Sequence, residues 1–162
     1  MISENIASEI RRDFNVSPDQ EMLPISVGEA ELFWDWFRKC SELTTVDVDL
    51  PPRINDKSLL GQCYANSQFE AVNNNCDYCE GFMKVKGHFY YHAYNVSLNR
   101  VVDVTANEYF IDDVTGLLPI DYYGIIIPND LIWDINGEAI DTYEKNRIKP
   151  LLKTYWERTW VK

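Results

Sequence analysis

Apolar residues at the start of the chain recur with the spacing of a helix. Four of them lie on one side of such a helix, at Ile2, Ile6, Ile10 and Phe14. The step from Ser17 to Pro18 ends it, because the residue before a proline disfavours the α conformation. After Gly28 a second amphipathic stripe follows, made of Leu32, Phe33, Trp36, Phe37 and Cys40. We expect two N-terminal helices, with the aromatic cluster Phe33, Trp34, Trp36 and Phe37 in the core.

A third helix follows Gly61, because Ala65, Phe69 and Val72 share one helical face and the triplet Asn73-Asn74-Asn75 ends the pattern. Residues 44–56 alternate briefly before Pro51-Pro52. They predict a short edge strand or an extended connection.

The chain then changes to β character. Segments 78–86, 89–97 and 100–105 are rich in aromatic and β-branched residues, with turn signals at 86–87 and 97–99. One or two further strands are expected near 109–113 and 122–128. The tail 139–162 is expected to be mostly helical and kinked or divided at Pro150. Helices followed by a run of strands predict an α+β fold with a mainly antiparallel sheet.

Length and charge narrow the functional classes. The 162 residues fit one domain spanning 1–162. With 15 Lys and Arg against 26 Asp and Glu, the net charge is −11. We therefore expect no direct binding to nucleic acid, and we expect any charged partner to be basic. A protein that imitates nucleic acid is an extreme alternative; a solvated acidic surface is the simpler interpretation.

The compartment follows from features that are missing from the sequence. No segment approaches the roughly 20 apolar residues of a membrane span, and the first residues lack the pattern of a signal peptide. We therefore expect a cytoplasmic protein, without membrane contact, whose four cysteines are reduced. The oligomeric state stays open.

Cys63 stands at the predicted start of the third helix, directly after Gly61-Gln62. Free N–H groups and the positive end of the helix dipole stabilise a thiolate there, and the same N–H groups can hold an oxyanion. The alternative is an inert buried cysteine, which is common.

His92 and Asp103 lie on neighbouring predicted strands. If the hairpin turns through 97–100, Val96 pairs with Val101 and Tyr94 opposes Asp103. Asp103 is then a diagonal neighbour of His92 on the same face, within reach of a hydrogen bond. A register slip of one residue would place Asp103 on the other face, and an Asp facing water on an edge strand is the alternative.

Cys63, His92 and Asp103 together have the chemistry of a catalytic triad. The thiolate attacks a carbonyl, the histidine moves the proton, and the aspartate fixes the tautomer of the imidazole. Candidate oxyanion donors are the backbone N–H of Cys63, the Gln62 side chain, and the ring N–H of Trp34 or Trp36; we favour the first two.

The ordered motifs resemble a known family. GQCYANS (61–67), HAYNV (92–96) and VVDVT (101–105) are similar to the nucleophile, histidine and aspartate motifs of transglutaminase-like proteins, with EGFMKV (80–85) in place of the strand between helix and histidine. The likeness covers about residues 58–105 and extends to YYGIIIP (122–128). It implies a papain-like fold with a core at about 58–128 and helical flanks at 1–42 and 139–162.

The resemblance implies a Cys63–His92–Asp103 enzyme that transfers an acyl group from an amide, with no metal or cofactor. Hydrolysis of a peptide or isopeptide bond, amidase action or glutamine deamidation is expected rather than cross-linking. The His-to-Asp gap is short for the family, and Tyr94 stands where Trp is usual. Asn66, Tyr94 and Glu80 are expected beside the site, where they would orient a protein or peptide substrate.

Two other classes remain open. An acidic protein on the same fold can act without catalysis, for example as an inhibitor in a host-interaction setting that binds a basic surface. Cys76-x-x-Cys79 can form half of a zinc site, but a second pair of ligands is not evident in the sequence. Two reduced structural cysteines are the simpler interpretation.

Overall fold

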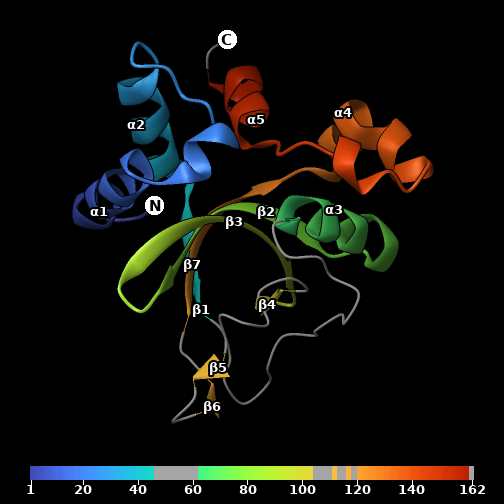
Figure 1. Ribbon diagram of the computed structural model, residues 1–162, viewed down its shortest axis with the longest axis horizontal. Coiled ribbons are helices and arrows are strands. Elements are labelled where there is room, and N and C mark those ends of the chain that lie inside the picture. Colours follow the sequence, from blue (N-terminus) through green and yellow to red (C-terminus); the bar gives the residue numbers. More distant parts are fainter. Residues whose placement is uncertain (46–61, 104–110, 113–115, 118–119, 161–162) are drawn as a thin grey trace.

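The computed structural model describes residues 1–45, 62–103, 111–112, 116–117 and 120–160 (Figure 1). Its α-helices are α1 (Glu4–Asn15), α2 (Ala30–Cys40), α3 (Cys63–Asn74), α4 (Asn129–Asp141) and α5 (Leu152–Thr159), and its 3₁₀ helices are η1 (Pro18–Glu21) and η3 (Lys145–Arg147). The strands of the main sheet are β1 (Glu42–Thr45), β2 (Asp77–Val85), β3 (His88–Ser97), β4 (Arg100–Val102) and β7 (Asp121–Ile127). A separate hairpin consists of β5 (Ile111–Asp112) and β6 (Gly116–Leu117).

The five-stranded sheet has the order β1-β7-β2-β3-β4, and every neighbouring pair is antiparallel. This confirms the α+β class. The sheet curls, so that the edge strands β1 and β4 approach each other. Gly81 and Gly124 face each other across β2 and β7 at the curl. A Cβ atom on Gly81 would lie 2.1 Å from the Tyr123 carbonyl oxygen, so only glycine fits there.

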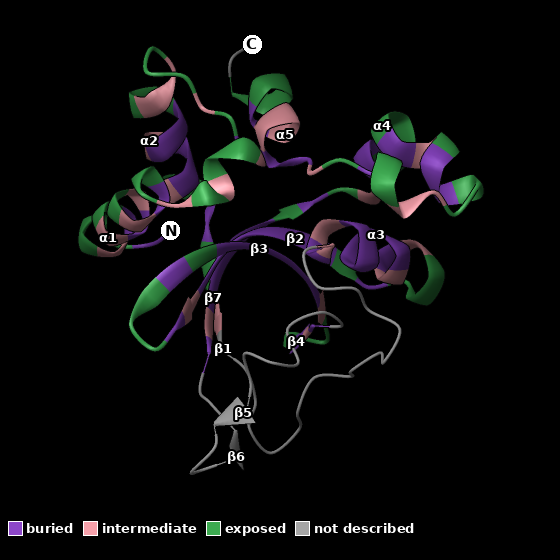
Figure 2. Cartoon of the chain, in the orientation of Figure 1, coloured by how far each residue is buried: buried purple, intermediate pink, exposed green. Residues whose placement is uncertain are grey.

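The helices lie on the outer, convex side of the curl, as Figure 1 shows. Their buried faces form the main core with that side of the sheet, which Figure 2 colours purple. The predicted aromatic cluster is buried as expected: Phe33, Trp34, Trp36 and Phe37 are each at most 6% exposed. Leu32 and Cys40, which the predicted stripe included, are exposed instead.

A second, smaller core lies on the concave face. It contains Cys79, Met83, Val85, Tyr94, Val101, Ile120 and Tyr122. Both β-hairpins that shape this face turn where the sequence predicted, with positive φ at Lys86-Gly87 and at Leu98-Asn99. The sheet therefore separates two apolar layers, and Cys63 packs in the main one whereas Tyr94 and Tyr122 pack in the concave one.

The C-terminal tail differs from the prediction. A helix was expected from 139, but α4 begins at Asn129, directly after β7, and ends at Asp141. Pro128 is its N-cap, and its buried face includes Leu131, Ile132 and Ile140. Pro150 lies in the connection between η3 and α5, so it divides the tail, as one of the two alternatives predicted. The apolar residues of 131–140 recur with a helical period, but they follow the apolar strand almost directly. Without a polar loop to mark the boundary, the start of the helix was predicted too late.

Two other expected strands are only partly tested. The predicted segment 44–56 begins in β1, which is an edge strand as one alternative proposed, while Pro51-Pro52 lies outside the described residues. The segment expected at 100–105 is a strand up to Val102. Among the described helices, none combines the length and apolarity needed to cross a bilayer.

Candidate active site

Cys63 is the first residue of α3, as the sequence predicted. Its side chain is buried, with 8% of the residue exposed. Gln62 precedes it as the N-cap and makes no side-chain capping bond. The N–H groups of the first turn of a helix lack partners within the helix, so the thiol lies at a position suited to hold negative charge.

His92 lies on β3 with its side chain on the concave face. It pairs with Gly81 on β2, so no neighbouring side chain from that strand crowds the ring. Asp103 follows β4 directly and is fully buried. The register pairs Val96 with Val101, as predicted, and the His92 Nε2 atom lies 2.6 Å from Asp103 Oδ2.

The environment of His92 favours its protonated form. Burial opposes the charge, but the charges of Asp103 and Cys63 and the hydrogen bonds to both side chains outweigh it and raise the pKa of His92 to about 10. Asp103 holds Nε2, and the side chain of Cys63 also forms a hydrogen bond with the His92 ring. The structure thus brings all three predicted triad residues together.

A residue that the sequence analysis did not single out completes this arrangement. The Tyr122 hydroxyl, on β7, donates a 2.7 Å hydrogen bond to the same Asp103 oxygen that His92 contacts. Burial and the charge of Asp103 raise the pKa of Tyr122 well above its ordinary value, so the hydroxyl keeps its proton. The sequence did predict a strand at 122–128, which includes Tyr122. It did not predict the order of the strands, so the contact of Tyr122 with Asp103 could not be inferred.

Tyr94 lies next to the triad, where burial, followed by the charges of Cys79 and Asp103, raises the pKa of its hydroxyl well above its ordinary value. Its ring lies 4.6 Å from that of Tyr122, between centroids, and is fully buried. Its hydroxyl approaches Gly124, where a Cβ atom would come within 2.3 Å of it. Tyr94 therefore forms the floor of the concave face next to the triad, while its predicted contact with substrate stays a prediction.

Gln62 and Asn66 frame the nucleophile. The Gln62 carbonyl accepts a 2.9 Å hydrogen bond from the Asn66 N–H, which closes the first turn of α3. The buried Oε1 atom of Gln62 finds no partner in the described part of the chain. Asn66 Oδ1 accepts a 2.8 Å hydrogen bond from Lys145, on η3. Asn66 thus ties the C-terminal segment to the turn that carries Cys63.

The side chain of Glu80 points away from His92. Glu80 pairs with Ala93 and is one residue away from Gly81, the partner of His92, so its side chain points to the convex face. Both oxygens are occupied: the hydroxyls of Tyr78 and Tyr91 donate to them, and the backbone N–H groups of Leu151 and Leu152 do so at 2.5 and 2.7 Å. The structure makes Glu80 the anchor of α5 instead of a substrate contact.

The other three cysteines differ from Cys63 in their surroundings. Burial raises the pKa of Cys76 to about 11 and raises that of Cys79 further, and both thiols are protonated at neutral pH. Cys40 is exposed on α2. In the parts of the chain that are described, no group of three or more possible metal ligands gathers, around Cys76 and Cys79 or elsewhere.

Comparisons with protein families, with curated proteins and with solved structures found no match to this chain. The site is therefore interpreted from its own geometry.

Proposed function

We propose that the protein is a cysteine-dependent acyl-transfer enzyme that acts on an amide bond. One observation carries the proposal: Cys63 begins a helix beside His92, whose second nitrogen is held by Asp103 at 2.6 Å. A nucleophile, a base and a group that orients the base are the parts of a catalytic triad, whatever the surrounding fold.

Each residue has a role in the reaction. The Cys63 thiolate attacks the amide carbonyl, and the protonated His92 gives its proton to the leaving amine as the C–N bond breaks. The thioester that remains is attacked by water, which passes one proton to His92, and the carboxylic acid leaves as Cys63 returns to thiolate. Asp103 keeps the imidazole in one orientation throughout.

The oxyanion of the tetrahedral intermediate needs donors beside Cys63. The backbone N–H of Cys63 is one, because it begins α3. Gln62 is the second. Its buried amide oxygen has no partner among the described residues, and a 180° turn of the amide group places an N–H there instead.

The proposed fold is papain-like, with the nucleophile on a helix and the histidine on an antiparallel sheet. The proposed substrate is a protein or peptide amide, and the net charge of −11 favours a basic one. Hydrolysis or deamidation is proposed over cross-linking because the motifs depart from the family pattern, with a short gap between His92 and Asp103 and Tyr94 where Trp is usual.

A trapping experiment tests the proposal. The purified protein is mixed with a peptide digest of a cell lysate and quenched in acid, and the Cys63 peptide is searched by mass spectrometry for a mass increment. We expect an acyl adduct that hydroxylamine releases, and none with Cys63→Ala. Absence of any adduct, together with a digest that the wild-type protein leaves unchanged, would contradict acyl transfer.

A further inference from the structure

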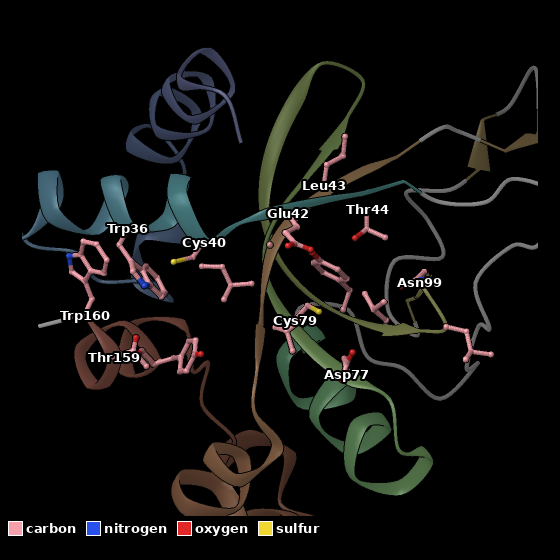
Figure 3. A pocket seen from close by; sticks show the side chains of 17 residues that line it. Trp36, Cys40, Glu42, Leu43, Thr44, Asp77, Cys79, Asn99, Thr159 and Trp160 are labelled. Atoms are coloured by element: carbon pink, nitrogen blue, oxygen red, sulfur yellow. The ribbon is translucent and has the colours of Figure 1, made fainter. Parts of the chain in front are cut away.

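A cavity with a volume of about 1010 Å³ lies along β7, where residues of α2 and α5 meet residues from the concave side of the sheet. It is a groove. Figure 3 shows Trp36 and Trp160, from α2 and α5, at one end and Asn99, in the turn between β3 and β4, at the other. Its size is at the upper end of the ~300–1,000 Å³ typical of ligand pockets, which is enough for several residues of a peptide.

A free strand edge lies in this groove. β1 pairs with β7 only as far as Gly124, whereas β2 pairs with β7 up to Ile127. Residues 125–127 of β7 therefore have a strand partner on one side only, within the described sheet. Ile125 and Ile126 line the groove. Backbone groups along such an edge can pair with an added strand, and pockets for alternate side chains then select the sequence.

Exposed apolar side chains gather around the same groove. Leu43, Leu98, Ile126 and Trp160 all line it, and each is between 42% and 92% exposed. Scattered apolar side chains on a surface need no explanation, but a group around one groove is typical of a binding surface. The groove thus offers both an apolar wall and backbone hydrogen-bonding groups.

The charge of the groove selects its occupant. Glu42 and Asp77 are exposed and line it, and the described lining contains no Lys, Arg or His. Neither carboxylate takes part in an ion pair within the described part of the chain. Glu42 pairs with Gly124 at the near end of the free edge. Asp77 lies one residue beyond Tyr78, the partner of Ile127, at the far end.

We propose that this groove binds an extended, basic polypeptide segment, which adds as a strand to residues 125–127 of β7 and places positive side chains near Glu42 and Asp77. Along the strand direction the two carboxylates are about four residues apart, or roughly 13 Å, and Asp77, on β2, lies two strands or roughly 10 Å to the side of the added strand, within reach of a long lysine side chain. Two basic residues separated by three others on one extended chain match that spacing. The inference concerns binding only and does not depend on the triad chemistry.

The test uses the full chain with Cys63→Ala, so that binding is measured without turnover. The probe is a fluorescein-labelled peptide, TKVTVKT, followed by fluorescence anisotropy at low salt. We expect saturable binding below about 1 mM, weakened about tenfold or more when both lysines are glutamate. Two further peptides carry N-methyl groups on alternate backbone amides, each along a different edge of the extended peptide. Binding should be abolished in the one whose methylated edge faces β7, because methylation blocks strand pairing.

A matched pair of variants locates the site. Glu42→Gln with Asp77→Asn should weaken the lysine peptide about tenfold. Glu21→Gln with Asp130→Asn removes the same charge from exposed positions outside the groove and should leave affinity unchanged. Three results would overturn the proposal: no saturation, equal affinity for lysine and glutamate peptides, or equal loss in both double variants. Binding that survives both N-methyl peptides would assign the groove to another kind of ligand and contradict strand addition.

Discussion

The hydrogen bonds around Asp103 concentrate two donors on one oxygen. His92 Nε2 and the Tyr122 hydroxyl both contact Oδ2, at 2.6 and 2.7 Å, in a fully buried setting. Hydrogen bonds to a carboxylate in such a site favour its charged form, and that charge in turn favours protonated His92. Tyr122 is thus a positioning residue, which acts on the imidazole through the aspartate.

Tyr122→Phe tests this role. Losing the hydroxyl removes a neutral donor from Oδ2, which leaves more of the carboxylate charge to act on the imidazole, so the pKa of His92 should rise by a few tenths to about one pH unit. Proton NMR titration of the two histidine rings measures it, with His88→Asn to assign the signals. Tyr123→Phe is the matched control, because Tyr123 is the next residue on β7 and points to the opposite face. A His92 titration that is the same in both variants would rule out the role.

Asp103→Asn should have a larger effect on the same histidine. The asparagine side chain carries no charge, so the main attraction that raises the pKa of His92 disappears and the pKa should fall by more than one unit. Any acyl-transfer rate should fall about 10³-fold, because the imidazole loses its orientation. If the rate and the histidine titration are unchanged, Asp103 does not act on His92.

At the scale of elements, the buried carboxylate of Glu80 holds the C-terminal helix to the sheet. Leu151 is the N-cap of α5 and Leu152 its first residue, and their N–H groups have no partners within the helix. Glu80 accepts both, and Tyr78 and Tyr91 occupy its remaining positions. Burial is the main reason that the pKa of Glu80 is raised, and the four hydrogen bonds counteract it.

Glu80→Gln should destabilise the protein by about 3 kcal/mol. The amide nitrogen cannot accept, so donors that faced one carboxylate oxygen lose their partner in a buried site, at about 1–3 kcal/mol each. Urea denaturation measures the free energy of unfolding. Glu157→Gln, an exposed Glu-to-Gln change on α5, is the control and should cost less than about 0.5 kcal/mol. Equal stability of the two variants would contradict the anchor.

The part of the β3 edge that has no strand partner in the described sheet is bound by two carboxylates from the N-terminal elements. Asp13, in α1, accepts a 3.0 Å hydrogen bond from the Phe89 N–H, and Asp19, in η1, accepts one of the same length from the Tyr91 N–H. These carboxylates cover the part of β3 that β4 does not reach. They show how the N-terminal helices protect the strand that carries His92.

The elements that the sequence predicted well are those with a strong local signal. The amphipathic periods gave α1, α2 and α3, and the turn residues at 86–87 and 97–99 fixed both hairpins. The second hairpin in turn fixed the position of Asp103 relative to His92, because register on one face follows from the turn. The geometry of the His92–Asp103 pair was therefore predictable from 92–103 alone, whereas the place of Cys63 beside it depends on how α3 packs.

What the sequence did not reveal depends on contacts between distant segments. The order β1-β7-β2 brings Tyr122 and Gly124 beside β2, and no local pattern specifies that order. Glu80 was expected near His92 because both lie on neighbouring strands. Its side chain points to the other face, where it meets residues 71 and 72 positions later in the chain. Such pairings arise only when the C-terminal segment packs.

At the scale of the whole molecule, the curl of the sheet gives the two faces different tasks. The convex face holds the helices and the large aromatic core. The concave face holds His92 and the Asp103–Tyr122 pair, and the groove reaches from this face to α2 and α5. Of the 26 acidic residues, Glu42 and Asp77 line that groove, which suits the basic partner that we propose.

The triad also makes stability depend on pH. A histidine whose pKa is higher in the folded chain than the ordinary 6.5 stabilises the fold fully below pH 6.5, and this stabilisation is lost as the pH rises through its folded value, about 10 for His92. The destabilisation caused by Asp103→Asn should therefore be larger at pH 6 than at pH 10. Urea denaturation in a Cys63→Ala background measures it without titration of that thiol. An equal difference at both pH values would contradict a protonated His92.

The most direct test of the central claim compares the reaction of the four cysteines with iodoacetamide. Cys40 is exposed, whereas Cys63 is 8% exposed and Cys76 and Cys79 are buried. Access alone would make Cys40 react first. An imidazolium partner that stabilises the thiolate predicts that Cys63 reacts first at pH 6, and that His92→Gln slows Cys63 about tenfold or more without changing Cys40. If Cys40 reacts first in the wild-type protein and His92→Gln leaves the reaction rate of Cys63 unchanged, His92 does not activate Cys63 as a nucleophile.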